Sequence, residues 1–116
     1  MARMKRPAAI AACLALPGAT RDNPWGHEPV FKVGGRMFAM PDGAGGCMFK
    51  VTDIAYEVLV ESGRADPAPY MARAKWVRLR DLGEEDGAEV TAWLATAHAL
   101  IAAKLTRAKR RELGLA

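Results

Sequence analysis

Apolar residues recur at the three-to-four-residue spacing of a helix in three parts of the chain. A first helix is expected from about Pro7, a residue suited to a first helical turn, until the Leu-Pro-Gly sequence at residues 16–18 ends it. A second, shorter helix is expected between residues 52–53, one of which caps it, and Gly63. The longest helix is expected over residues 86–106. Its apolar stripe consists of Val90, Leu94, Ala97, Ile101 and Leu105.

Between these helices, apolar and polar residues alternate with the period of two that is typical of strands. Residues 29–33 and 36–40 flank Gly34-Gly35, a pair that can supply the positive φ angles of a tight hairpin turn. Residues 47–51 and 75–80 are expected to form two more strands. The order helix, hairpin, strand, helix, strand, helix predicts an α+β fold with a single antiparallel sheet and three helices packed on one face.

Length and composition fit a soluble globular protein. With 116 residues, 51% of them hydrophobic and 26% charged, residues 1–116 are expected to form a single domain. Residues 8–16 are apolar and follow basic residues, as in a signal peptide, but this run is short and no cleavage site follows it. Cys13 and Cys47 form no metal or redox motif and are expected to be buried thiols. We therefore expect a cytoplasmic protein without a membrane span.

The distribution of basic residues points to a polyanionic partner. Lysine and arginine number 17 against 13 acidic residues, a net charge of +4. Alternation in residues 75–80 sends Val77 and Leu79 into the core and the residues between them to the opposite face. If the strands are neighbours, that open face carries a basic and aromatic surface able to bind phosphates and stack on a base, as in single-strand binders. Its members are Lys32, Lys50, Trp76, Arg78 and Arg80.

This surface also has a purely structural interpretation. Any half-buried sheet carries polar residues outside, and lysine or arginine stems can shield an exposed tryptophan. The outer positions of these strands carry no acidic residue, which favours function, although Glu28 and Asp81 lie just beyond the strand ends. A rival class is a protein-interaction or adaptor module in which Trp76 meets a partner protein and the basic residues form the rim.

Two further segments are basic. Lysines and arginines continue from the last helix into the C-terminal tail, where they either complement the helix dipole and solubilise the end, the interpretation we favour, or bind phosphates. These residues are Lys104, Arg107, Lys109, Arg110 and Arg111. The segment from Arg64 to Arg73 holds two prolines and Tyr70 and is expected to form a wing-like loop beside the sheet.

Residues with catalytic potential are isolated. The single serine, Ser62, lies at a predicted helix end without a nucleophile-elbow sequence, and neither Cys13 nor Cys47 has a histidine nearby in sequence. His27 and His98 are far apart, and a core role is favoured for His98 in the last helix. We therefore expect no catalytic residue and no enzyme activity.

Glycine-rich and acidic clusters have simple structural explanations. Residues 43–46 are glycine-rich, but no lysine follows them and no helix opens there, so they are expected to form a hairpin loop rather than a phosphate cradle. Four acidic residues could bind a hard cation, yet a helix N-terminus favours such residues without metal. They are Glu84, Glu85, Asp86 and Glu89. No metal and no cofactor are expected.

Several short motifs, in order, resemble those of the MmcQ/YjbR family. They are Leu16-Pro17-Gly18, Pro24-Trp25-Gly26, the hairpin from Phe31 to Ala39, Phe49-Lys50-Val51, Pro69-Tyr70, Lys75-Trp76-Val77 and Ala103-Lys104-Leu105. Trp25 and Arg36 stand where the family more often has Phe and Lys. The resemblance implies a frataxin-like (CyaY-like) α+β fold and DNA binding.

Together, these observations predict a non-enzymatic protein that binds nucleic acid, DNA first, mainly through phosphates on a basic sheet face. A protein partner is the alternative, and neither a small-molecule substrate nor a membrane partner is evident. The central candidates are Lys50, Trp76, Arg78 and Arg80, with Lys32, Arg36 and Arg73 around them.

Overall fold

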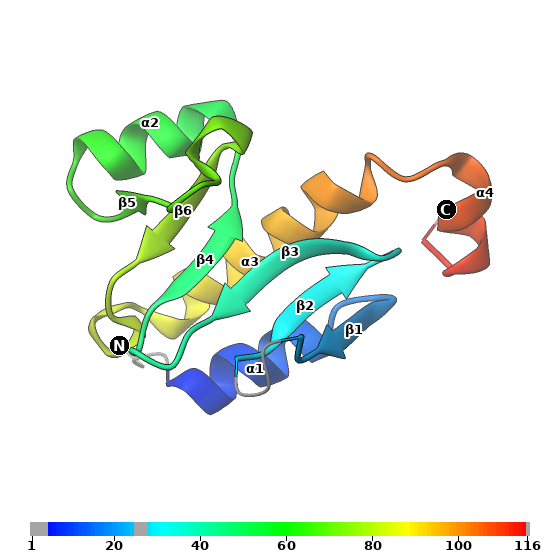
Figure 1. Ribbon diagram of the computed structural model, residues 1–116, viewed down its shortest axis with the longest axis horizontal. Helices are drawn as coiled ribbons and strands as arrows, with labels where there is room; N and C mark the ends of the chain where they lie inside the picture. Colours follow the sequence, from blue (N-terminus) through cyan, green and yellow to red (C-terminus); the bar gives the residue numbers. More distant parts are fainter. Residues whose placement is uncertain (1–4, 25–27, 116) are drawn as a thin grey trace.

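A computed structural model describes residues 5–24 and 28–115 of the chain. Six strands form one antiparallel sheet in the order β1-β2-β3-β4-β6-β5 (Figure 1). The strands are β1 (Ala19–Asp22), β2 (Val30–Val33), β3 (Arg36–Pro41), β4 (Cys47–Lys50), β5 (Asp66–Pro67) and β6 (Trp76–Leu79). The helices are α1 (Arg6–Leu14), α2 (Asp53–Glu61), α3 (Gly87–Ala102) and α4 (Arg107–Glu112), with 3-10 turns η1 (Ala72–Ala74) and η2 (Leu82–Glu84).

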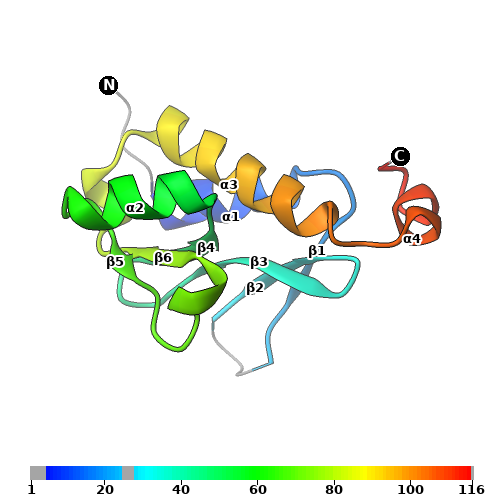
Figure 2. The same cartoon turned by 90° about the horizontal axis from the view of Figure 1, so that it is seen from above.

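The helices α1, α2 and α3 lie together on one face of the sheet (Figure 2). The main core lies between these layers, where strand residues such as Phe31, Phe49 and Val77 pack with Cys13 of α1 and Leu94 of α3. We call the opposite side of the sheet the open face. The predicted fold class, an antiparallel sheet with three helices on one face, is confirmed.

Local chemistry explains where the elements begin and end. Thr52 is the N-cap of α2, because its hydroxyl oxygen accepts the backbone N–H of Ala55 at 3.1 Å. Gly63 follows Ser62, the C-cap of α2, and its φ of +77° stops the helix there. Gly34 and Gly35, at φ +60° and +82°, form the predicted tight turn between β2 and β3.

Three elements were not foreseen. The strand β1 is almost entirely exposed, so no apolar alternation marks it in the sequence. Residues 66–67 lie in the segment expected to form a loop, but they form the strand β5, in which Pro67 pairs with Val77 of β6. That strand is at the sheet edge, where a missing N–H is tolerated. The C-terminal tail forms α4, whose N-cap Thr106 accepts the N–H of Lys109 at 3.0 Å.

A β-bulge shifts the register between β2 and β3. Phe31 pairs with Ala39 but Lys32 pairs with Met37, so Phe38 is the extra residue on β3. Phe38 and Ala39 both belong to the helix-side core, and Arg36 pairs with Val33 of that same core. Arg36 therefore lies on the helix side of the sheet and not on the open face.

Among the residues described, no helix combines the length and apolar character that crossing a membrane requires. Trp25, Gly26 and His27, which entered the sequence arguments, lie outside the described residues.

Candidate nucleic-acid interface

Strand pairing places most of the predicted interface residues on one face. Lys50 pairs with Trp76, and Met48 pairs with Arg78. Because directly paired residues point to the same side of a sheet, these side chains share the open face. Lys32 pairs with Met37, which packs against the open-face cluster around Trp76. The predicted adjacency of the strands and the outward direction of these side chains are thus found.

The prediction that Trp76 is exposed is wrong. Trp76 is only 3% exposed. It packs with Val30, Met40 and Ala68, and Met71 lies against the same cluster. The segment of residues 68–75, which we call the 68–75 loop, folds over the indole. Two backbone hydrogen bonds join the loop to Trp76: the N–H of Ala68 donates to the carbonyl of Trp76, and the N–H of Trp76 donates to the carbonyl of Met71. Trp76 is therefore unavailable for stacking on a base.

Three of the predicted cations are paired with acidic residues. Lys32 Nζ lies 3.0 Å from Asp22 Oδ2. Arg80 Nη1 lies 2.7 Å from Asp66 Oδ1, and its other terminal nitrogen donates to the carbonyl of Gly63. The acids belong to the edge strands β1 and β5, outside the strands that carry the cations. These pairs reduce the positive charge that the open face offers to a phosphate.

The third pair, Arg78 with Asp42, is the most enclosed. Arg78 Nε donates to Asp42 Oδ2 at 2.9 Å, and the N–H groups of Ala44 and Gly46 donate to Oδ1 at 2.9 and 3.0 Å. A Cβ on Gly46 would lie 2.5 Å from Arg78 Nη2, so glycine is needed for the guanidinium to fit. Burial raises the pKa of Asp42, but Arg78 and the two N–H groups together hold it below its ordinary value. The glycine-rich loop thus supplies two N–H donors to Asp42 and leaves space for the guanidinium of Arg78.

Unneutralised positive charge gathers where β4 ends and β6 begins. The pKa of Lys50 is lowered first by burial and then by the nearby charges of Lys104 and Lys75, while Asp53 acts in the opposite direction. Lys50 Nζ donates to the carbonyl of Ala74, next to Arg73. We call the set Lys50, Arg73, Lys75 and Lys104 the basic end.

The remaining predicted residue, Arg36, approaches the basic end from the helix side. It follows the β2–β3 turn, which lies against Leu105, directly after Lys104. Arg36 and Arg73 are exposed, and neither has an ion pair among the described residues. The structure therefore buries Trp76 and divides the six predicted cations into an ion-paired group, Lys32, Arg78 and Arg80, and a group at or near the basic end, Lys50, Arg73 and Arg36.

Tyr70 is the aromatic residue that the sequence argument did not select. It is fully exposed and has φ +65°, a backbone conformation that costs a non-glycine residue roughly 1–2 kcal/mol. The 68–75 loop projects from the open face, away from the helices (Figure 2). Its sequence signal was a tyrosine within a proline-containing loop, which predicts exposure more directly than a strand position does. Tyr70 thus stands three residues before Arg73.

The other candidate chemical groups have structural roles. The hydroxyl of Ser62 donates to the carbonyl of Leu59 at the end of α2, and burial raises the pKa values of Cys13 and Cys47. Arg64 binds both Glu85 and Glu89. Among residues 5–24 and 28–115, no group of three histidine, cysteine or acidic side chains is placed to hold a metal ion.

Comparisons with known proteins agree with this fold. The family model YjbR matches residues 14–100. The crystal structure of Deinococcus radiodurans protein DR2400, which has a DUF419 domain, is similar, with a TM-score of 0.79 and 27% identity over 91% of this chain and 85% of that one. No curated protein matches the sequence significantly. DUF419 and YjbR/MmcQ are the same family, so the predicted resemblance is confirmed and the chain belongs to the YjbR family.

Proposed function

We propose that this protein binds nucleic acid without catalysis, using Tyr70 and the basic end rather than the centre of the sheet face. The observation that carries the proposal is a fully exposed tyrosine in the strained loop that leads to the basic end, whose lysines have no ion pair among the described residues. A base can stack on such a ring, for about 1–3 kcal/mol, while neighbouring cations bind the phosphates on either side. DNA is the first candidate, and an unpaired strand suits an exposed ring best.

The charge arrangement supports this location over the one predicted from sequence. Arg78 and Arg80 have acidic partners within the fold, so binding a phosphate there would require an existing ion pair to be exchanged. At the basic end, burial comes first among the causes that lower the pKa of Lys50, and repulsion from Lys104 and Lys75 adds to it. An anion bound between them would remove this repulsion. The YjbR family is not a known enzyme family, which agrees with a binding role.

The test is fluorescence anisotropy with labelled single-stranded DNA, duplex DNA and RNA at low and near-physiological salt. Saturable binding is expected to weaken by about 0.7 log units per log unit of salt for each phosphate neutralised on a single strand. Arg73→Ala should weaken binding and lower that slope. Arg21→Ala is the matched control, since it removes the same charge from an exposed residue of β1, at the far edge of the sheet. Equal losses in both variants would contradict the proposed location.

A protein-binding role is the second candidate, and one observation favours it. Met37, Met48 and Met71 are half-buried around Trp76 on the open face. Methionine side chains adapt to varied partner surfaces, as at other promiscuous binding sites. This candidate takes precedence if no nucleic acid binds even at low salt, because apolar docking depends little on ionic strength.

A further inference from the structure

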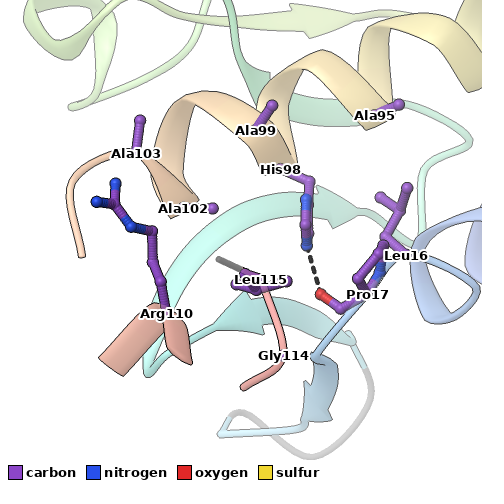
Figure 3. Close-up of a pocket in the computed structure, with 10 residues that line it drawn as sticks. All are labelled: Leu16, Pro17, Ala95, His98, Ala99, Ala102, Ala103, Arg110, Gly114 and Leu115. Atoms are coloured by element: carbon purple, nitrogen blue, oxygen red, sulfur yellow. Dashed lines mark hydrogen bonds between the residues drawn. The ribbon is translucent and has the colours of Figure 1, made fainter. Parts of the chain in front are cut away.

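A cavity of about 560 Å³ lies away from the 68–75 loop and from the strands β4 and β6 at the basic end. It opens between α3, the turn that follows α1 and the C-terminal segment (Figure 3). Small-molecule sites typically measure about 300–1,000 Å³, so this cavity is large enough for a ligand.

The cavity is hollow because, apart from His98, the side chains that α3 presents to it are methyl groups. Ala95, Ala99, Ala102 and Ala103 line one wall, whereas the core-facing stripe of the same helix carries larger side chains such as Leu94. The opposite wall is the end of the chain, where Gly114 at φ +75° turns the backbone back toward α3. The N–H of Leu115 bonds to the carbonyl of Arg110 at 2.7 Å, which fixes that turn. The walls are therefore held apart by backbone geometry rather than filled by side chains.

Two polar side chains border the cavity, and only one of them has a hydrogen-bond partner within the described part of the chain. His98 is buried and donates from Nε2 to the carbonyl of Pro17 at 2.7 Å (Figure 3). Its ring also makes a T-shaped contact with that of Phe38. Arg110 is half-buried, and within the described part of the chain its guanidinium has no hydrogen-bond acceptor and no acidic partner. The neighbouring Lys109, by contrast, lies 3.8 Å from Glu112. A half-buried guanidinium without an acceptor matches a carboxylate, which it binds with two parallel hydrogen bonds.

We infer that this cavity binds a small amphipathic carboxylate, with its hydrocarbon chain along the alanine wall of α3 and its carboxylate on Arg110. The inference is independent of nucleic-acid binding, because it uses another set of residues. It assigns Arg110 a role beyond solubilising the tail.

The experiment is an NMR titration of the full chain with decanoate below its micelle concentration, following backbone amide shifts. Saturable shifts at residues lining the cavity are expected, with weaker binding of decanol, which has the same chain without the charge. Arg110→Gln should raise the dissociation constant about tenfold, the loss of one charged hydrogen-bonded pair. Arg111→Gln, one residue along the same helix, should leave it unchanged.

Filling the cavity tests the apolar half of the site. Ala99→Leu should abolish decanoate binding, whereas Ala92→Leu, at an exposed position of α3 that does not line the cavity, should preserve both fold and binding. Decanoate binding that survives Ala99→Leu would overturn the inference, and so would decanol binding as tightly as decanoate. Binding of a peptide with an apolar C-terminal residue, without binding of decanoate, would overturn the inference of a small ligand and indicate the C-terminal tail of a partner protein instead.

Discussion

Replacing Gly34 by alanine tests how the β2–β3 turn is seated against the end of α3. A Cβ on Gly34 would lie 2.7 Å from both methyl carbons of Leu105, a core residue that is 8% exposed. Gly35, the next residue of the turn, also has positive φ, but a Cβ there meets nothing within 4 Å. The two substitutions therefore share a backbone penalty and differ only in the contact with Leu105.

The structure sets the size of each effect. Left-handed backbone costs an alanine roughly 1–2 kcal/mol, which is the whole expected loss for Gly35→Ala. Overpacking a core side chain adds about 1–3 kcal/mol for Gly34→Ala. The atoms that clash are the ends of a flexible side chain, so the added loss belongs near the lower limit, about 1 kcal/mol.

Urea unfolding of both variants, alone and combined with Leu105→Ala, measures this difference as a double-mutant cycle. Leu105→Ala removes the atoms that clash, so in that background Gly34→Ala should cost no more than Gly35→Ala. The reasoning is refuted if the two glycine variants lose equal stability in the natural sequence, or if Leu105→Ala leaves their difference unchanged.

Three further predictions concern the candidate interface. Tyr70→Gly should raise the free energy of unfolding by about 1 kcal/mol, because glycine adopts a positive φ without strain, yet it should weaken single-strand binding. Tyr70→Phe should retain binding. Unfolding curves and anisotropy titrations check these two effects. Trp76→Ala should cost about 3–5 kcal/mol in thermal or urea unfolding, and a loss below 1 kcal/mol would contradict its burial. The pKa of Asp42 is held below its ordinary 3.8, so the stability from its ionised form is complete above about pH 4 and is lost as pH falls through the lower folded-state pKa. Asp42→Asn should therefore flatten this part of the acid dependence in urea unfolding between pH 2 and 7.

Local sequence patterns predicted the elements that local chemistry determines. The Gly34-Gly35 turn, a helix cap at residue 52 or 53 and the apolar stripe of the longest helix each depend on neighbouring residues, and each is present, with Thr52 as the cap and the helix ending at Ala102 rather than near residue 106. Strand alternation also gave the correct direction for Lys50 and Arg78. It could not show what covers a face, because the partner of Arg78 is 36 residues away and the cover of Trp76 is an irregular loop.

Arg36 shows a second limit of the alternation argument. The single extra residue Phe38 reverses the side of every position between the bulge and the turn relative to the rest of β3. No local signal marks a bulge there, since Phe38 fits a regular strand equally well. Strand alternation thus predicted the directions of Lys50 and Arg78, but not the long-range neighbours that decide charge and exposure.

The two edges of the sheet restrict how any partner can dock. On one side, β5 offers only two residues, and Pro67 has no N–H to donate. On the other, the exposed positions of β1 include the charged Arg21 and Asp22. An added strand from another chain would find few hydrogen-bonding groups at the first edge and charged side chains at the second. Such edges oppose sheet extension and aggregation, and they direct recognition to loops, faces and cavities.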